Sequence, residues 1–202
     1  MREQDFHTLS GWVDYDRGSL GSLTKSQELR YFSRRVKRTV LLPLHRMCRD
    51  DKRGWKRESP LLCFGTCLCC AIEALGKFHT GKTKRGNSAS NFKAFVRAYM
   101  DPGWRANRFS GKPLVDHLYD SFRCGLTHGF TIKQGGFERH GSTFQVKVVG
   151  NVQQLELDPD LLFRDFEAGF GRFLAHLSAV NKADPAYKRF RKAFQDVFVL
   201  GK

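Results

Sequence analysis

The sequence is short of acidic residues. Its 202 residues include 20 aspartates and glutamates against 35 lysines and arginines, which gives a formal net charge of +15. Such an excess of positive charge favours a polyanionic partner, either a nucleic acid or an anionic membrane surface. A helix that binds a membrane surface has a broad apolar face with a basic rim. In this sequence, every segment with such a face is also expected to pack in the core, so the sequence favours a nucleic acid over a membrane.

The sequence also lacks a long apolar run in which a membrane span or a signal peptide would lie. Its longest apolar stretch, residues 61–75, is interrupted by Glu73 and is shorter than a transmembrane helix requires. The N-terminal residues Met1–Asp5 are charged and lack the apolar core of a signal peptide. These features predict a cytoplasmic protein without a membrane segment.

The six cysteines lack the spacing through loops that disulfide frameworks have. Most of them lie in an apolar, helix-like segment, which predicts buried and reduced thiols. Cys63, Cys67 and Cys70 would share one face of that helix, but a structural zinc site takes ligand pairs from separate elements. No second cysteine or histidine pair accompanies them, so we expect neither a metal ion nor another cofactor.

Hydrophobic periodicity predicts a mainly helical fold. Two further helices are each expected to begin at an Asp-Pro pair, in which the aspartate caps the helix and the proline occupies its first position. The predicted helices are 24–49, 61–78, 88–100, 112–128, and those that follow Asp158-Pro159 and Asp184-Pro185. Strand-like alternation over 143–157, around Gly150-Asn151, predicts one β-hairpin inserted after the fourth helix.

The chain divides into an arm and one domain. Residues 1–23 are polar and glycine-rich, so we expect a flexible N-terminal arm. Residues 24–202 then form a single helical domain, in which residues 131–140 are a glycine-rich loop. Pro43 lies inside the first predicted helix and is expected to kink or end it.

The first helix carries a basic stripe beside its apolar face. Arg34 and Arg38 lie one turn apart on this stripe. Lysine and arginine at one-turn spacing suit a track for backbone phosphates of RNA, and a plain solvated helix face has the same pattern. Both interpretations stay open at the level of sequence.

One segment matches a nucleotide-binding pattern. Gly76–Thr83 reads G-x-x-x-x-G-K-T, the pattern of the phosphate-binding P-loop. That loop requires a preceding strand and a following helix whose N-terminus faces the phosphates. Here a helix precedes it and a polar loop follows, so a P-loop nucleotide hydrolase is the second alternative. A basic loop in which Lys82, Lys84 and Arg85 contact RNA phosphates fits the segment better.

The helix predicted over 112–128 carries a pair with chemical potential. Arg123 and His128 fall outside its apolar stripe and are about 140° apart around an ideal helix. The long arginine side chain can still swing towards the imidazole. Because arginine binds phosphate through a forked set of donors and histidine transfers protons near neutral pH, the two make a minimal phosphodiester-cleaving pair.

A purely structural interpretation explains the same residues. Asp116 and Asp120 lie near Arg123 on the same face of the predicted helix, so a surface ion pair together with a capping histidine would suffice. Glu73 in the apolar helix also needs a partner. We expect Glu73 either to form a buried ion pair or to orient Arg123 and His128.

The segment Tyr119–Gly129, Tyr-Asp-Ser-Phe-Arg-Cys-Gly-Leu-Thr-His-Gly, resembles the HEPN superfamily of nucleic-acid-associated helical domains. The signature of that superfamily is an arginine, four to six residues, and a histidine at the end of a helix. Many of its members are metal-independent endoribonucleases of toxin–antitoxin, abortive-infection and CRISPR-linked antiviral systems. The resemblance implies a HEPN-like helical bundle and a nuclease that acts on RNA.

The resemblance also implies roles for individual residues. His128 would act as general acid or base and Arg123 would stabilise charge on the phosphate, while the RNA 2′-hydroxyl attacks that phosphate. The resemblance carries over these two residues only; Glu73 and Asp120 are candidate supporting residues because of the positions described above. Cys124 is a third, and it departs from the small polar residue, often Asn or Asp, that the superfamily usually has there. The first alternative is therefore a catalytically silent module that binds RNA or a protein.

In the HEPN superfamily the arginine and histidine of two copies cluster across a dimer interface. The resemblance therefore implies a homodimer with a composite active site, and an antitoxin, an activator or a larger defence complex as further partners. A polar seam with helical spacing is a candidate surface for the second copy, and its members are His117, Ser121, Cys124 and His128.

Overall fold

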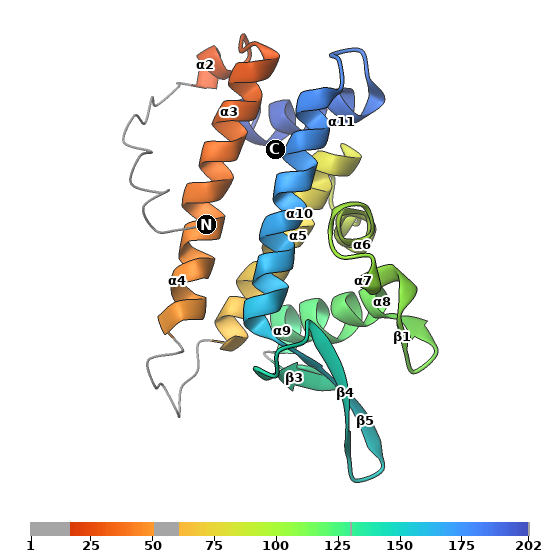
Figure 1. Ribbon diagram of the computed structural model, residues 1–202. Helices are drawn as coiled ribbons and strands as arrows, with labels where there is room; N and C mark the ends of the chain where they lie inside the picture. Colours follow the sequence, from red (N-terminus) through yellow and green to blue (C-terminus); the bar gives the residue numbers. More distant parts are fainter. Residues whose placement is uncertain (1–16, 51–60, 130, 202) are drawn as a thin grey trace.

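The computed structural model describes residues 17–50, 61–129 and 131–201, which form a helical bundle with two small sheets (Figure 1). Helices account for 67% of the residues, so the predicted mainly helical class is confirmed. Residues 1–16 of the expected arm lie outside the described residues. The short helix α2 (Arg17–Leu20) follows, and Leu20 and Leu23 are buried in the core.

The longer helices follow the predicted order along the chain, whereas one short helix, Gly103–Ala106, was not predicted. The longer helices are α3 (Lys25–Val36), α4 (Leu42–Asp50), α5 (Leu61–Thr80), α6 (Ser88–Tyr99), α10 (Pro159–Ala179) and α11 (Pro185–Phe194). The shorter ones are α7 (Gly103–Ala106), α8 (Leu114–His117) and α9 (Cys124–Gly129). Wider π-helical turns join or extend several of them, namely η1 (Lys37–Leu41), η3 (Leu118–Arg123) and η4 (Gln195–Val199).

The first long helix is built from α3, η1 and α4. Thr24 and Gln27 form the predicted capping box at its start, where the backbone N–H of Thr24 donates to Oε1 of Gln27 at 2.8 Å. Pro43 does not end this helix. The turn η1 lies immediately before the α4 segment that contains Pro43, and a π-helical turn tolerates the missing N–H and the bulk of the proline ring.

Helix α5 is the centre of the bundle, and α4, α6, α10 and α11 pack around it (Figure 1). The closest approach is to α6 at Gly76, where an added Cβ atom would lie 2.1 Å from the backbone oxygen of Asn91. A glycine is therefore required at this crossing. Helix packing thus explains Gly76, the first glycine of the pattern that resembles a P-loop.

The apolar part of α5 is longer than the sequence suggested. The helix has 20 residues and, by length and composition alone, is long and apolar enough to cross a membrane. This corrects the expectation that no segment reaches such a length. More than half of the span is buried within the protein, and the core helix of a soluble protein passes the same test.

The prediction of buried cysteines is wrong for half of them. Cys63, Cys67 and Cys70 are exposed along one side of α5, whereas Cys48 and Cys69 are buried. The error has a simple origin. Because the side chains on α5 are apolar nearly all round, composition could not identify which side of the helix is exposed.

Phenylalanines from several helices meet in the core. The ring centroid of Phe32 in α3 lies 4.6 Å from that of Phe78 in α5 and 5.2 Å from that of Phe190 in α11. The predicted aromatic faces of α10 and α11 are buried, including Phe163, Phe166, Phe170, Phe173, Phe190 and Phe194. This confirms that these aromatic side chains form the core.

The predicted hairpin is confirmed. Strands β4 (Phe144–Val149) and β5 (Val152–Leu157) pair in antiparallel register, and Gly150 in the turn has a φ of +62°. Leu155 and Leu157 of β5 are fully buried, so the inner half of the hairpin packs on the helices. The outer half projects away from the bundle (Figure 1).

Two smaller strand pairings were not predicted. Strand β3 (Gly135–Phe137) pairs in parallel with β5, within the segment expected to be a loop. At Gly135 an added Cβ atom would lie 1.9 Å from the backbone oxygen of Leu155, so the glycine permits this pairing. The short strands β1 (Arg108–Phe109) and β2 (Lys112–Pro113) pair just before α8.

Candidate functional site

Arg123 and His128 lie on one continuous helix formed by α8, η3 and α9. The buried side of this helix is mostly apolar, and Leu118, Phe122 and Leu126 are fully buried. Gly125 faces the returning chain, where an added Cβ atom would lie 2.3 Å from the backbone oxygen of Thr131. The helix therefore fits tightly against the segment that leads into the sheet, and His128 stands at its exposed C-terminal end.

Glu73 of α5 binds Arg123 directly. Nε and Nη2 of Arg123 donate to the same Oε2 atom of Glu73, at 3.0 and 2.7 Å. The other oxygen of Glu73 accepts a hydrogen bond from Oγ of Ser88 at 2.8 Å, and Nζ of Lys77 lies 4.0 Å from it. The side chains of Glu73 and Arg123 are only 10% and 15% exposed. The buried charge of Glu73 therefore has the ion pair that the sequence required.

The remaining nitrogen of the guanidinium, Nη1, faces His128. It lies 3.4 Å from Nε2 of His128 and 3.5 Å from Oγ1 of Thr127. Thr127 is itself held because its hydroxyl donates to the backbone oxygen of Arg123 at 2.7 Å. The predicted swing of the arginine towards the imidazole is thus present. We call Arg123, His128, Glu73, Ser88 and Thr127 together the Arg–His site.

The Arg123–His128 contact has a defined direction. An arginine side chain has no hydrogen-bond acceptor, so Nε2 of His128 must accept this bond. The imidazole therefore carries no proton on Nε2 while the contact is made. In this arrangement an unprotonated Nε2 atom of His128 lies beside a fixed guanidinium, which can stabilise negative charge next to it.

The surroundings keep Arg123 charged. Burial alone would lower the pKa of Arg123, but the hydrogen bond and the charge of Glu73 outweigh it, so the pKa lies above its ordinary value. Tyr119 packs against the guanidinium, with 5.6 Å between Cζ of Arg123 and the ring centroid. Burial and the neighbouring Cys124 raise the pKa of Tyr119, although Arg123 lowers it. Tyr119 therefore stays a neutral phenol at the side of the site.

The carboxylates expected from the same helix do not contact Arg123. Asp120 is exposed, and Asp116 pairs with Lys93 at 2.9 Å. The ion pair proposed in the structural interpretation therefore has a different acidic partner, Glu73. Cys124 is half-buried.

The predicted polar seam is wrong. His117 is buried, and its Nε2 atom lies 2.7 Å from the backbone oxygen of Phe109, while Ser121 is also buried. The spacing assumed a regular α-helix, but the π-helical turn η3 adds a residue to one turn. An added residue rotates the upstream faces by about 100°, so His117 and Ser121 no longer share a side with His128.

The predicted RNA-binding residues fall in two places. Lys82, Lys84 and Arg85 are exposed on the loop between α5 and α6. Arg34 is half-buried on α3 and Arg38 is exposed on η1. No contact within the Arg–His site comes from any of these five side chains.

The P-loop alternative lacks its structural context. Helix α5 runs through Gly76 to Thr80, so a helix and not a strand leads into the loop. Helix α6 begins at Ser88, and Oγ of Ser88 is bound to Glu73. The geometry that a P-loop requires around its phosphates is therefore not formed by this segment.

Sequence reasoning missed four residues that lie next to Arg123 or Glu73. Lys77 lies four residues after Glu73 on α5, a spacing that indicates an ion pair. Thr127 lies four residues after Arg123 on the same helix, and that spacing alone could have indicated the contact. Tyr119 lies four residues before Arg123, with the same signal. Ser88 reaches Glu73 from another helix, and no local pattern predicts such a contact.

No group of three or more His, Cys, Asp or Glu side chains that could bind a metal ion occurs within residues 17–50, 61–129 and 131–201. What the described residues offer at the Arg–His site is one imidazole and one fixed guanidinium, which suit proton transfer and charge stabilisation. No protein-family model, no curated protein and no solved structure matches the chain.

Proposed function

We propose that this protein is a metal-independent endoribonuclease of the HEPN type, in which Arg123 and His128 act on the scissile phosphate. The observation that carries the proposal is the 3.4 Å contact between Nη1 of Arg123 and Nε2 of His128. Glu73 occupies the other two nitrogens of the guanidinium, so this contact is fixed and faces outward. The +15 charge of the chain supports a polyanionic substrate.

The proposed reaction is an intramolecular transesterification at a phosphodiester of the RNA chain. A base removes the proton from the 2′-hydroxyl, whose oxygen attacks the adjacent phosphorus. Negative charge grows on the phosphate oxygens, where Arg123 stabilises it. An acid protonates the departing 5′-oxygen, which leaves a 2′,3′-cyclic phosphate on one product and a 5′-hydroxyl on the other.

This reaction gives dimerisation a chemical reason. One imidazole cannot be an unprotonated base and a protonated acid in the same step. His128 is exposed at the end of α9, where a second copy of the chain can bring its own His128 alongside. We therefore propose a homodimer in which one His128 is the base and the other is the acid.

The proposed biological setting is a toxin or an antiviral-defence effector in the cytoplasm. Such an enzyme needs control, either by an antitoxin or by an activator within a larger complex. The RNA would be drawn to basic surfaces outside the Arg–His site, with Arg34, Arg38, Lys82, Lys84 and Arg85 as the proposed contacts.

A catalytically silent module is the second candidate, because of Cys124. This half-buried thiol lies where the HEPN superfamily usually has a small polar residue. A silent module would still bind RNA or a partner protein. It predicts RNA binding that survives Arg123→Ala, and no cleavage under any condition.

The test is an RNA cleavage assay in EDTA, with wild type, His128→Ala and Lys112→Ala compared at equal concentration. Both side chains are exposed, so each variant should fold, and Lys112→Ala serves as the control because it lies outside the Arg–His site and the proposed RNA contacts. We expect cyclic-phosphate ends from wild type and Lys112→Ala, and none from His128→Ala. Cleavage that EDTA abolishes, or that survives His128→Ala, overturns the proposal, and RNA binding without cleavage points to the silent module.

A further inference from the structure

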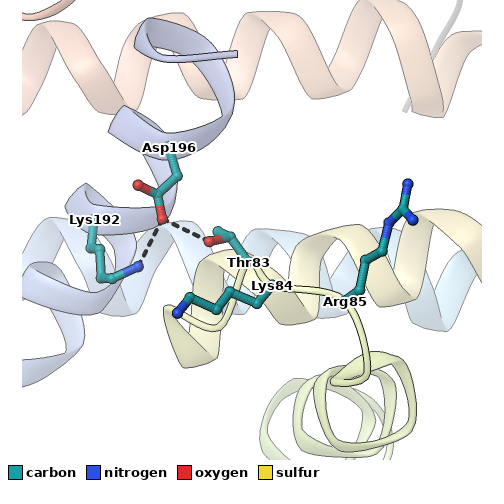
Figure 2. A pocket seen from close by; sticks show the side chains of 5 residues that line it. All are labelled: Thr83, Lys84, Arg85, Lys192 and Asp196. Carbon is teal, nitrogen blue, oxygen red and sulfur yellow. Dashed lines mark hydrogen bonds and ion pairs between the residues drawn. The ribbon is translucent and has the colours of Figure 1, made fainter. Parts of the chain in front are cut away.

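A basic pocket lies between the loop after α5 and the C-terminal helix (Figure 2). Its volume is about 430 Å³, and the loop contributes Thr83, Lys84 and Arg85 to its lining. Lys192 of α11 and Asp196 of η4 complete the lining. The lining contains three cationic side chains and one carboxylate, so positive charge is in excess and the pocket suits an anion.

The carboxylate of Asp196 organises the pocket. Its Oδ2 atom accepts hydrogen bonds from Oγ1 of Thr83 and from Nζ of Lys192, both at 2.7 Å. Figure 2 shows Asp196 between these two side chains, with Lys84 and Arg85 following along the loop. The side chain of Asp196 is 17% exposed. Asp196 therefore fastens the loop to the helix and fixes the ammonium group of Lys192 at the pocket.

Two side-chain amide groups hold the backbone of the loop. The fully buried Asn91 donates to the backbone oxygen of Lys82 at 2.9 Å, and Asn87 donates to that of Lys84 at 3.1 Å. Gly81 and Gly86 begin and end the turn with φ values of +72° and +87°. A loop that is already ordered loses little entropy when it binds a ligand.

The lining selects a phosphate group. Lysine and arginine side chains bind phosphate oxygens, and the five lining residues include no aromatic ring on which a nucleobase could stack. The pocket is open and lies on the surface loop, so a phosphodiester that belongs to a longer chain can enter it.

The loop connects this pocket to the Arg–His site. Ser88 ends the loop and donates to Glu73, the carboxylate that binds Arg123. The Cα atoms of Arg85 and Ser88 are three residues apart and so separated by at most about 11 Å. The loop therefore begins beside the pocket and ends at the carboxylate that holds Arg123.

We infer that this pocket is a phosphate subsite for the RNA backbone, a few nucleotides away from the scissile bond. The pocket adds Lys192, held by Asp196, to the basic loop. The inference rests on the proposed function insofar as RNA is the ligand of both sites. The subsite recognises the backbone and not the bases, so it sets affinity and position without sequence preference.

The test measures RNA binding in a His128→Ala background, so that cleavage cannot interfere. Fluorescence anisotropy with a labelled single-stranded RNA is followed over a range of KCl concentrations. The pocket variants are Lys84→Gln with Arg85→Gln, and separately Lys192→Gln. The control is Arg105→Gln with Lys112→Gln, which removes the same charge from exposed positions on α7 and β2. Thermal unfolding of each variant verifies the fold.

We expect the pocket double variant to bind RNA about tenfold more weakly at low salt. The slope of log affinity against log salt should fall by about 0.7 for each phosphate that the variant no longer neutralises, and so by about 1.4 for two phosphates. Lys192→Gln should lower the slope by about half as much. The control double variant should change the slope by much less.

Equal losses of affinity in the pocket and control variants would overturn the inference, because they would reflect overall charge alone. Inorganic phosphate that binds the parent protein but not the pocket double variant, and that leaves RNA binding unchanged, would assign the pocket to a free anion and overturn the inference as well. The outcome is independent of catalysis. If the pocket variants weaken RNA binding but the wild type never cleaves RNA, the subsite is retained and the proposed function is rejected. If the wild type cleaves RNA but the pocket variants bind it normally, the proposed function is retained and the subsite is rejected.

Discussion

Arg123 has three nitrogen atoms that can donate hydrogen bonds, and one carboxylate oxygen takes two of them. Oε2 of Glu73 accepts from Nε and Nη2, which leaves Nη1 for His128 and for a ligand. This arrangement fixes the plane of the guanidinium. In the proposed reaction, Glu73 is therefore a positioning residue, which would act through Arg123 and not by contact with RNA.

Substitution of Glu73 tests this role. In Glu73→Ala, Arg123 has no ion-pair partner on α5, and we expect the free energy of unfolding to fall by about 1.5–3 kcal/mol. A guanidinium displaced by about 1 Å should lower kcat for RNA cleavage about 100-fold, with a smaller change in KM. Glu73→Gln keeps an acceptor for Arg123 and should recover part of kcat. Chemical denaturation and steady-state kinetics measure the two effects.

Lys77 provides the control for this prediction. Its Nζ atom lies 4.0 Å from Glu73 and it is more exposed than Arg123. Lys77→Gln should therefore change neither kcat nor stability by much. If Glu73→Ala folds and retains the kcat of wild type, Glu73 does not position Arg123.

At the scale of elements, the crossing of α5 and α6 determines whether the site can form. Glu73 lies on α5 and its partner Ser88 begins α6, so the two helices must approach closely for the carboxylate to be held beside Arg123. Gly76 allows this approach, because an added Cβ atom there would lie 2.1 Å from the backbone of Asn91. The crossing therefore links packing to the geometry of the Arg–His site.

Gly76→Ala tests the crossing, and Gly171→Ala is its matched control. The clash at position 76 should cost about 3 kcal/mol, which exceeds the gain of about 1 kcal/mol in helix propensity. The free energy of unfolding should therefore fall by about 2 kcal/mol. Gly171 lies in α10 with no atom near an added Cβ, so alanine there should raise stability by about 0.5–1 kcal/mol. Denaturant unfolding distinguishes the two signs, and equal effects would refute the role of Gly76.

Local signals in the sequence predict most of the helices and the hairpin. The cap formed by Thr24 and Gln27, the Asp-Pro helix starts and the Gly150-Asn151 turn each act within a few residues, so pattern alone locates them. The π-helical turns have no such pattern, because their geometry responds to neighbouring helices. The turn η3 in particular buries His117, which regular helical spacing had placed on the surface.

The site was predictable to the extent that residue chemistry defines it. Arg123 and His128 stand out by type and spacing, and a charged Glu73 inside an apolar helix requires a partner. The choice of Glu73 over Asp120 as the partner of Arg123 depends on the packing of α5 against η3, which no local pattern contains. Ser88 and β3 were missed for the same reason.

At the scale of the whole molecule, the two proposed sites require different properties. In the proposal, the +15 charge draws an RNA to the surface at long range, and the pocket with Lys84, Arg85 and Lys192 holds the RNA backbone. The proposed chemistry at His128 requires two imidazoles in opposite protonation states. A single chain can supply the positive charge and the pocket, but two chains are needed to supply two His128 side chains.

A mixing experiment tests whether two chains form one active site. Wild type at constant concentration is mixed with a roughly tenfold excess of His128→Ala, with RNA in excess over all protein so that the variant cannot sequester it. If both His128 residues of a dimer are needed, most wild-type chains enter inactive heterodimers. Cleavage per wild-type chain should then fall roughly tenfold once the subunits exchange.

The same excess of serum albumin provides the control and should leave the rate unchanged. Dilution of wild type alone gives an independent reading, because activity per chain should fall as the dimer dissociates. A cleavage rate that neither His128→Ala nor dilution affects would mean that a single chain suffices. In that case another group would have to supply the second proton transfer, since the Nε2 atom of His128 that accepts from Arg123 cannot donate in the same step.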